Sequence, residues 1–175
     1  GPRYTYGEIG YSRVDFDNLN DDGNFGNIGG SIGIRDKLHL FAAFFKGSVD
    51  VSRFNVDLTN VEAGMGLNLP ISNTVDVVFD VAYLWTEVDA NNAGSDSEDG
   101  FGLRGGVRAM LTPKFELNGG ATYAEYNGSN DDDNTAVYVG GVYNFTDMLA
   151  MTADVSAGDN VTSYGVGLRL YFDVK

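Results

Sequence analysis

A two-residue alternation of large apolar residues with small or polar ones runs through almost the whole chain. In the stretch YGVGLRLYF, every second residue from Tyr164 to Phe172 is large and apolar. Successive side chains of a β-strand point to opposite faces of the sheet, so this alternation predicts strands with one apolar face. Helical spacing is absent over any useful length, and the 175 residues therefore indicate a single all-β domain, 1–175. The opening Gly1-Pro2 resembles the remnant of a cleaved tag.

The connectors between the candidate strands alternate between short and long. RDK, TPK and TDM each place three residues between two apolar positions, whereas DNLNDDGN (17–24), NNAGSDSEDG (91–100) and SNDDDN (129–134) are longer and acidic. Short turns at one end and longer polar loops at the other predict a transmembrane antiparallel up-and-down β-barrel. We expect ten strands, with eight as the alternative. The candidate strands are 4–16, 24–34, 38–50, 56–69, 74–88, 101–111, 115–127, 135–145, 149–157 and 161–173.

The alternation alone does not say which face meets water, because a soluble barrel would point its apolar face inward. Three observations favour the lipid-facing alternative. The side chains of the opposite face are short and many of its residues are glycine, as suits a crowded interior. The strand from Phe115 to Tyr123 has the roughly 9–11 residues that a tilted transmembrane strand needs. Aromatic residues also gather near the strand ends, as in the interfacial girdles of membrane barrels. The girdle near the long loops would contain Tyr83, Trp85, Phe101, Tyr123 and Tyr164, and the girdle near the short turns would contain Phe115, Tyr143, Phe145 and Phe172.

The opposite face carries charges that would lie inside the barrel, where each charge needs a partner. Counting residues from the short turns predicts one cluster of Arg108 with Asp76 and Glu116, and a second of Arg104 with Asp80 and Glu62. The full predicted lumen charge network is Glu62, Asp76, Asp80, Arg104, Arg108, Glu116, Asp154 and Arg169. Two interpretations stay open: a salt-bridge plug, or a narrow ion path gated by these pairs. Ten strands lie close to the eight that side chains just fill.

Composition excludes several kinds of chemistry. The net charge of −14 argues against a nucleic-acid partner, and the absence of cysteine excludes disulfides and thiolate metal sites. The one histidine, His39, lies beside a short turn with no Ser or Asp partner evident in the sequence. We therefore expect no enzymatic activity, no cofactor and no metal centre.

The acidic connectors raise the question of calcium. Asn18-x-Asn20-x-Asp22-Gly23 resembles the start of a calcium loop, but the twelfth position of that frame is Gly29 rather than Glu, so the EF-hand pattern fails. Asp131–Asp133 is a second oxygen-rich stretch. We interpret both as solvated surface loops, with weak divalent-cation binding near anionic lipopolysaccharide as the alternative.

The third candidate strand has a conflict of faces. The register that points Leu38, Leu40 and Phe44 toward lipid also points Lys46 outward and Val49 inward. Either a bulge near Phe44 or a snorkelling lysine would resolve the conflict.

Several segments resemble one known family. GNIGGSIGIRDKLHLFAAF, GFGLRGGVRAMLTPKFELNGGATYAEY and YGVGLRLYF are similar to small outer-membrane barrels designated sulfation-dependent quorum factors in many genomes. The last strand, with its Phe172, also resembles the assembly signal of bacterial outer-membrane proteins. The resemblance implies an outer-membrane location, release in vesicles and no catalytic residues. Outer-membrane lipid, lipopolysaccharide and the barrel-assembly machinery are the expected partners of a monomer. The expected role is structural or surface-interacting, with a narrow channel for ions or small solutes as the alternative.

Overall fold

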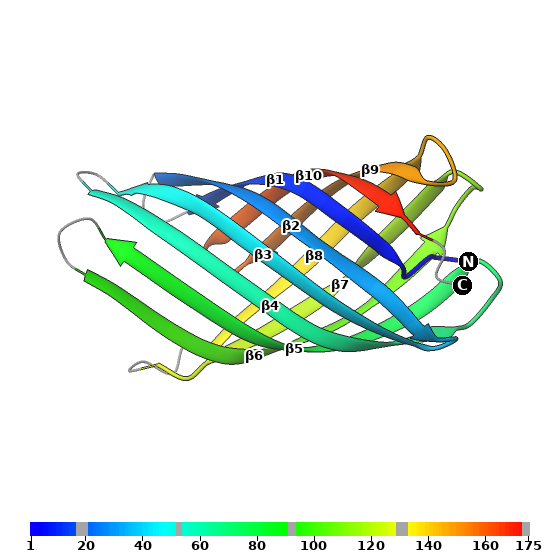
Figure 1. Ribbon diagram of the computed structural model, residues 1–175, viewed down its shortest axis with the longest axis horizontal. Helices are drawn as coiled ribbons and strands as arrows, with labels where there is room; N and C mark the ends of the chain where they lie inside the picture. Colours follow the sequence, from blue (N-terminus) through cyan, green and yellow to red (C-terminus); the bar gives the residue numbers. More distant parts are fainter. Residues whose placement is uncertain (17–20, 52–53, 91–93, 129–132, 173–175) are drawn as a thin grey trace.

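Ten antiparallel strands form one closed barrel in the computed structural model, which describes residues 1–16, 21–51, 54–90, 94–128 and 133–172. Each strand pairs with its sequence neighbours, and β1 closes the ring onto β10 (Figure 1). The expected fold class is confirmed, with ten strands rather than eight. The strands are β1 (Tyr6–Phe16), β2 (Asp21–Arg35), β3 (Leu38–Val51), β4 (Phe54–Pro70), β5 (Val75–Ala90), β6 (Gly94–Met110), β7 (Phe115–Tyr126), β8 (Asp133–Asn144), β9 (Leu149–Gly158) and β10 (Val161–Tyr171).

β1 begins and β10 ends at the barrel end that carries the turns after β2, β4, β6 and β8 (Figure 1). We call it the short-turn end, and the opposite one the long-connector end. The described residues include no helix long and apolar enough to cross a membrane.

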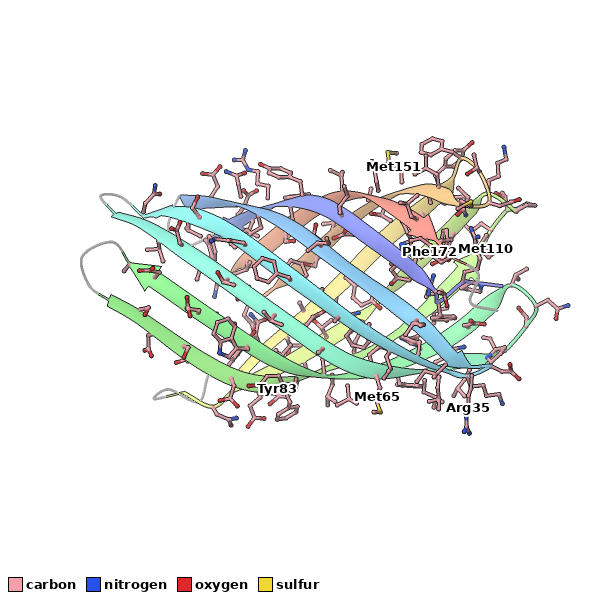
Figure 2. All side chains as sticks on the ribbon, in the orientation of Figure 1. Arg35, Met65, Tyr83, Met110, Met151 and Phe172 are labelled. Atoms are coloured by element: carbon pink, nitrogen blue, oxygen red, sulfur yellow. The ribbon has the colours of Figure 1, made fainter. Side chains whose placement is uncertain are left out.

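The apolar face of the wall points outward. Ile9, Val139 and Val166 are each more than half exposed, at 56%, 53% and 57%. Met65 and Met151 likewise point away from the barrel (Figure 2). Polar side chains occupy the inside, where Glu116 is 1% exposed. An apolar belt of this size in water would oppose the hydrophobic effect, which excludes the soluble-barrel alternative.

The nine aromatic residues of the two expected girdles lie on the outward side of the alternation. In the girdle expected near the long connectors, the rings of Phe101 and Tyr123 pack with centroids 6.2 Å apart. Near the short-turn end the rings of Tyr143 and Phe145 pack at 5.3 Å. Trp85 is half-buried, whereas Tyr83 is 54% exposed.

The polarity of the wall inverts toward the long-connector end. There Asn24, Lys46 and Asp57 point outward and are exposed, while Phe25 and Val49 point inward and are 7% and 5% exposed. These parts of the strands extend past the apolar belt, so their outer side meets water and their inner side holds apolar residues.

This inversion resolves the conflict in β3. Its pairing with β4 is continuous from Leu38 to Val51, so the bulge near Phe44, one of the two alternatives that the sequence left open, is absent. The register irregularity lies instead on β2, between Gly33 and Arg35. Lys46 does not have to snorkel toward water, because it already lies beyond the apolar belt.

Most strand boundaries differ from the sequence-based expectation, largely by one to three residues, and two of the differences change the interpretation. Residues 94–100 were expected to be loop but pair with β5 as the start of β6, from Gly94 opposite Ala90. Backbone hydrogen bonds extend the hairpin irrespective of its acidic side chains, because these residues lie outside the apolar belt. At the other end, Tyr4 and Thr5 were expected in the first strand, but β1 begins at Tyr6.

Candidate functional site in the barrel lumen

A deeply buried pair of an arginine and a glutamate joins neighbouring strands near the short-turn end. Arg108 on β6 donates from Nε to Glu116 Oε1 at 2.7 Å and from Nη2 to Glu116 Oε2 at 3.0 Å. The Arg108 and Glu116 side chains are 13% and 2% exposed. A two-bond contact between a guanidinium and a carboxylate fixes both groups, since each bond constrains the other.

Asp76 does not join this pair, although the sequence predicted that it would. It accepts a 2.8 Å hydrogen bond from the hydroxyl of Tyr4, a residue that precedes β1. Burial raises the pKa of the Tyr4 phenol, so the hydroxyl keeps its proton and acts as the donor. Nothing in the sequence pattern pointed to Tyr4, because its partners lie on strands far away in the chain.

A second cluster surrounds Arg104 on β6. Its guanidinium lies 3.5 Å from Asp80 and 3.6 Å from Glu62, the two partners that the strand order predicts. His39 Nε2 lies 3.3 Å from the other oxygen of Asp80, without the alignment of a hydrogen bond. His39 also contacts Asn68 through Nδ1, at 3.4 Å. The sequence pattern did not indicate that His39 contacts Asp80 inside the barrel.

Gly66 makes the contact between His39 and Asp80 possible. The three residues lie side by side across β3, β4 and β5. A Cβ at position 66 would overlap the Asp80 carboxylate and the His39 ring. The small residues of the inner face therefore make room for larger neighbours to meet above them.

Arg169 finds its acidic partner only because the barrel closes. On β10 it donates from Nε to Glu8 of β1 at 2.6 Å, and its guanidinium lies 3.9 Å from the centroid of the Tyr6 ring. Asp154 also lies inside the barrel, but the salt bridges found among the described residues do not include it.

Residues before β1 fold into the short-turn end of the lumen. The Tyr4 ring stacks on His39 at 4.9 Å, and the Arg108 guanidinium lies 4.5 Å from the Tyr4 centroid. Arg3 packs on the ring of Tyr171 at 3.6 Å and donates to Asn144 Oδ1 at 3.2 Å and to the Asp147 carbonyl. Thr5 accepts a 3.0 Å hydrogen bond from the Gly33 amide. We call residues 3–5 the N-terminal strap.

A cavity of about 460 Å³ remains inside the barrel. Its wall includes Tyr4, Glu62, Arg104, Tyr138 and Asp154. Three polar atoms of this wall, Asn27 Oδ1, Ser31 Oγ and Asp80 Oδ1, are buried without a hydrogen-bond partner. The lumen is thus filled by side chains near the short-turn end and hollow above them.

No group of three or more His, Asp or Glu side chains is arranged to hold a metal ion within the described ranges. Asn18, Asn20, Asp131 and Asp132 of the two acidic stretches lie outside the described residues, so the calcium alternative is not tested there.

Known structures share this architecture. The chain is similar to the translocator domain of the autotransporter NalP from Neisseria meningitidis, with a TM-score of 0.59 and 10% identity over 98% of this chain and 90% of that one. It is similar to an outer-membrane channel from Pseudomonas putida F1, with a TM-score of 0.61 and 14% identity over 98% and 97% of the two chains. It is also similar to the KdgM porin solved with disordered oligogalacturonate, with a TM-score of 0.57 and 12% identity over 95% and 99%. At such low identity these similarities concern the fold alone.

A comparison with curated protein sequences gives no significant match. The family model described as "Outer membrane protein beta-barrel domain" matches residues 1–145. That match covers most of the chain and agrees with the closed barrel, its outward apolar belt and its polar lumen. The chain therefore belongs to the outer membrane protein beta-barrel domain family.

Proposed function

We propose that this protein is a non-enzymatic outer-membrane barrel whose lumen is closed by side chains, with a structural or surface-interacting role. The observation that carries the proposal is the contact between Arg108 and Glu116. It lies in the narrow interior at the short-turn end, almost fully removed from solvent. Arg104 with Asp80 and Glu62, and Arg169 with Glu8, add further pairs to the same interior.

Such pairs oppose ion flow for an energetic reason. A permeating ion would have to separate a buried guanidinium from its carboxylate, which leaves each charge without compensation. Ten strands enclose only slightly more space than the eight that side chains fill completely. The closed lumen therefore follows from the size of the barrel and from the strength of its interior pairs.

Planar-bilayer recording tests the proposal. The wild type is expected to be silent, whereas Arg104→Ala and Arg108→Ala, which each remove a guanidinium from the lumen, are expected to show discrete current steps. Arg13→Ala is the matched control, since Arg13 pairs with Asp15 and Asp22 on the exposed outer side and its side chain is 56% exposed. Steady conductance of the wild type would overturn the closed lumen.

The second candidate is a narrow channel for ions or small solutes. The cavity of about 460 Å³ favours it, and so does the fold similarity to a porin and a channel. Acidic side chains outnumber arginines in the cavity wall, so a conducting lumen would prefer cations. A reversal potential measured across a salt gradient would reveal that preference.

We place the protein in the bacterial outer membrane as a monomer, in contact with lipid and lipopolysaccharide after insertion by the barrel-assembly machinery. The resemblance to the sulfation-dependent quorum factor barrels supports, in addition, release in vesicles. Weak divalent-cation binding at the acidic connectors is a further part of this proposal. Separation of outer membranes and shed vesicles on a density gradient tests the location, and the protein should be found in both fractions.

A further inference from the structure

We propose that the N-terminal strap, residues 3–5, is a removable seal of the short-turn end of the lumen, and that its release opens the barrel. The inference rests on the proposed closed lumen and names the part of the closure that can move. The strap belongs to no strand, since β1 begins at Tyr6. Its release would break the hydrogen bond from the Phe172 amide to the Thr5 carbonyl but none of the strand pairings of β1, which begin at Tyr6.

The strap crosses the lumen rather than following its wall. Tyr4 contacts His39 on β3 and Asp76 on β5, whereas Arg3 contacts Asn144 on β8 and Tyr171 on β10. In the closed ring of ten strands, β3 lies across from β8 and β5 lies across from β10. Two adjacent residues that contact opposite walls must span the interior between those walls.

The strap separates two hollow spaces. Tyr4 lines the inner cavity of about 460 Å³, and Arg3 lines a hollow of about 750 Å³ at the short-turn end. Glu116 borders both spaces, so the barrier between them is thin. Arg108 joins the two parts of this barrier, because it pairs with Glu116 and also donates to the Arg3 carbonyl at 3.1 Å. Arg108 and Glu116 lie on neighbouring strands, so without the strap their pair covers one side of the lumen and no longer has the Arg3 carbonyl and the Tyr4 ring against it.

The contacts of the strap are also of a kind that can be broken and remade. Tyr4 makes one hydrogen bond to Asp76 and two ring contacts, and Arg3 makes two polar contacts and packs on the Tyr171 ring. Thr5 accepts hydrogen bonds from the amides of Gly33 and Phe172. None of these contacts places a strap carboxylate or guanidinium in a buried ion pair. Release therefore costs less than separating Arg108 from Glu116 would.

Three proteins test the proposal in planar bilayers. Arg3→Ala/Tyr4→Ala removes both side chains that cross the lumen. Thr5→Cys/Gly33→Cys ties the strap to the wall, because a Cβ at Gly33 would lie 3.4 Å from Thr5 Oγ1 and the chain has no other cysteine. Tyr4→Phe is the matched control, since it keeps the ring between His39 and Arg108 and loses only the hydrogen bond to Asp76. Heat-modifiable gel migration confirms that each variant is folded before recording.

The expected result is no current steps from the wild type or from Tyr4→Phe, and discrete current steps from Arg3→Ala/Tyr4→Ala. If both the wild type and Arg3→Ala/Tyr4→Ala are silent, the strap is not the seal, while the closed lumen stands. If the wild type conducts and oxidation of Thr5→Cys/Gly33→Cys abolishes the current until a reductant is added, the strap is a gate and the permanently closed lumen is wrong. If the wild type conducts and oxidation has no effect, both proposals fail.

Discussion

Glu116→Gln tests whether the buried ion pair near the short-turn end holds the barrel together. The substitution keeps the size of the side chain and removes its charge. The Glu116 side chain is 2% exposed and that of Arg108 is 13% exposed, so solvent screens neither partner appreciably. Removal of one partner from a buried pair costs about 3–5 kcal/mol, because the other charge is left uncompensated.

The lower end of that range is expected here. Arg108 would still donate to the Arg3 carbonyl and lie over the Tyr4 ring. A loss of about 3 kcal/mol corresponds to more than a hundredfold change in the folding equilibrium constant, since about 1.4 kcal/mol is tenfold. Urea titration of the barrel in lipid vesicles measures this loss in the free energy of unfolding. The folded fraction is read on an unboiled gel, and the titration is run in both the folding and the unfolding direction.

Asp15→Asn is the matched control. It makes the same chemical change in a pair that lies 3.1 Å apart but on the exposed outer side of β1. Solvent screens that pair, so no measurable loss of stability is expected. Equal effects of Glu116→Gln and Asp15→Asn would refute the argument that burial gives the interior pair its strength.

Three further predictions concern the wall. Gly66→Val should lower the folded fraction on an unboiled gel, because the new side chain would overlap His39 and Asp80. Gly26→Ala should have no effect, since a Cβ there meets nothing within 4 Å. Equal losses in the two variants would contradict the argument that Gly66 is needed for space. Val139→Arg puts a charge on the lipid face and should cost about 2–4 kcal/mol in vesicles if it lies near mid-membrane, while Thr59→Arg, level with Lys46, should cost little. The fluorescence of Trp85, the only tryptophan, should be quenched by lipids carrying bromine on their acyl chains; an unquenched signal would argue that its face does not meet lipid.

The sequence alone predicted the antiparallel barrel and, within the apolar belt, the direction of each face. Short turns fix the register of each hairpin, and a period of two fixes which residues share a face. The glycine-rich polar face and the aromatic strand ends then indicate that the apolar face meets lipid. Arg104, Asp80 and Glu62 could be grouped because they lie on consecutive strands at similar heights.

Only the tertiary structure decided what lies across the lumen. Glu8 meets Arg169 because β1 closes onto β10, and His39 meets Asp80 because Gly66 leaves the space between them. Tyr4 replaces Arg108 as the partner of Asp76 because a segment outside the sheet folds into the barrel. Strand periodicity predicts neighbours within a wall, since backbone hydrogen bonds set that spacing. Contacts through the interior depend on closure, tilt and the room left by small residues, which local patterns do not encode.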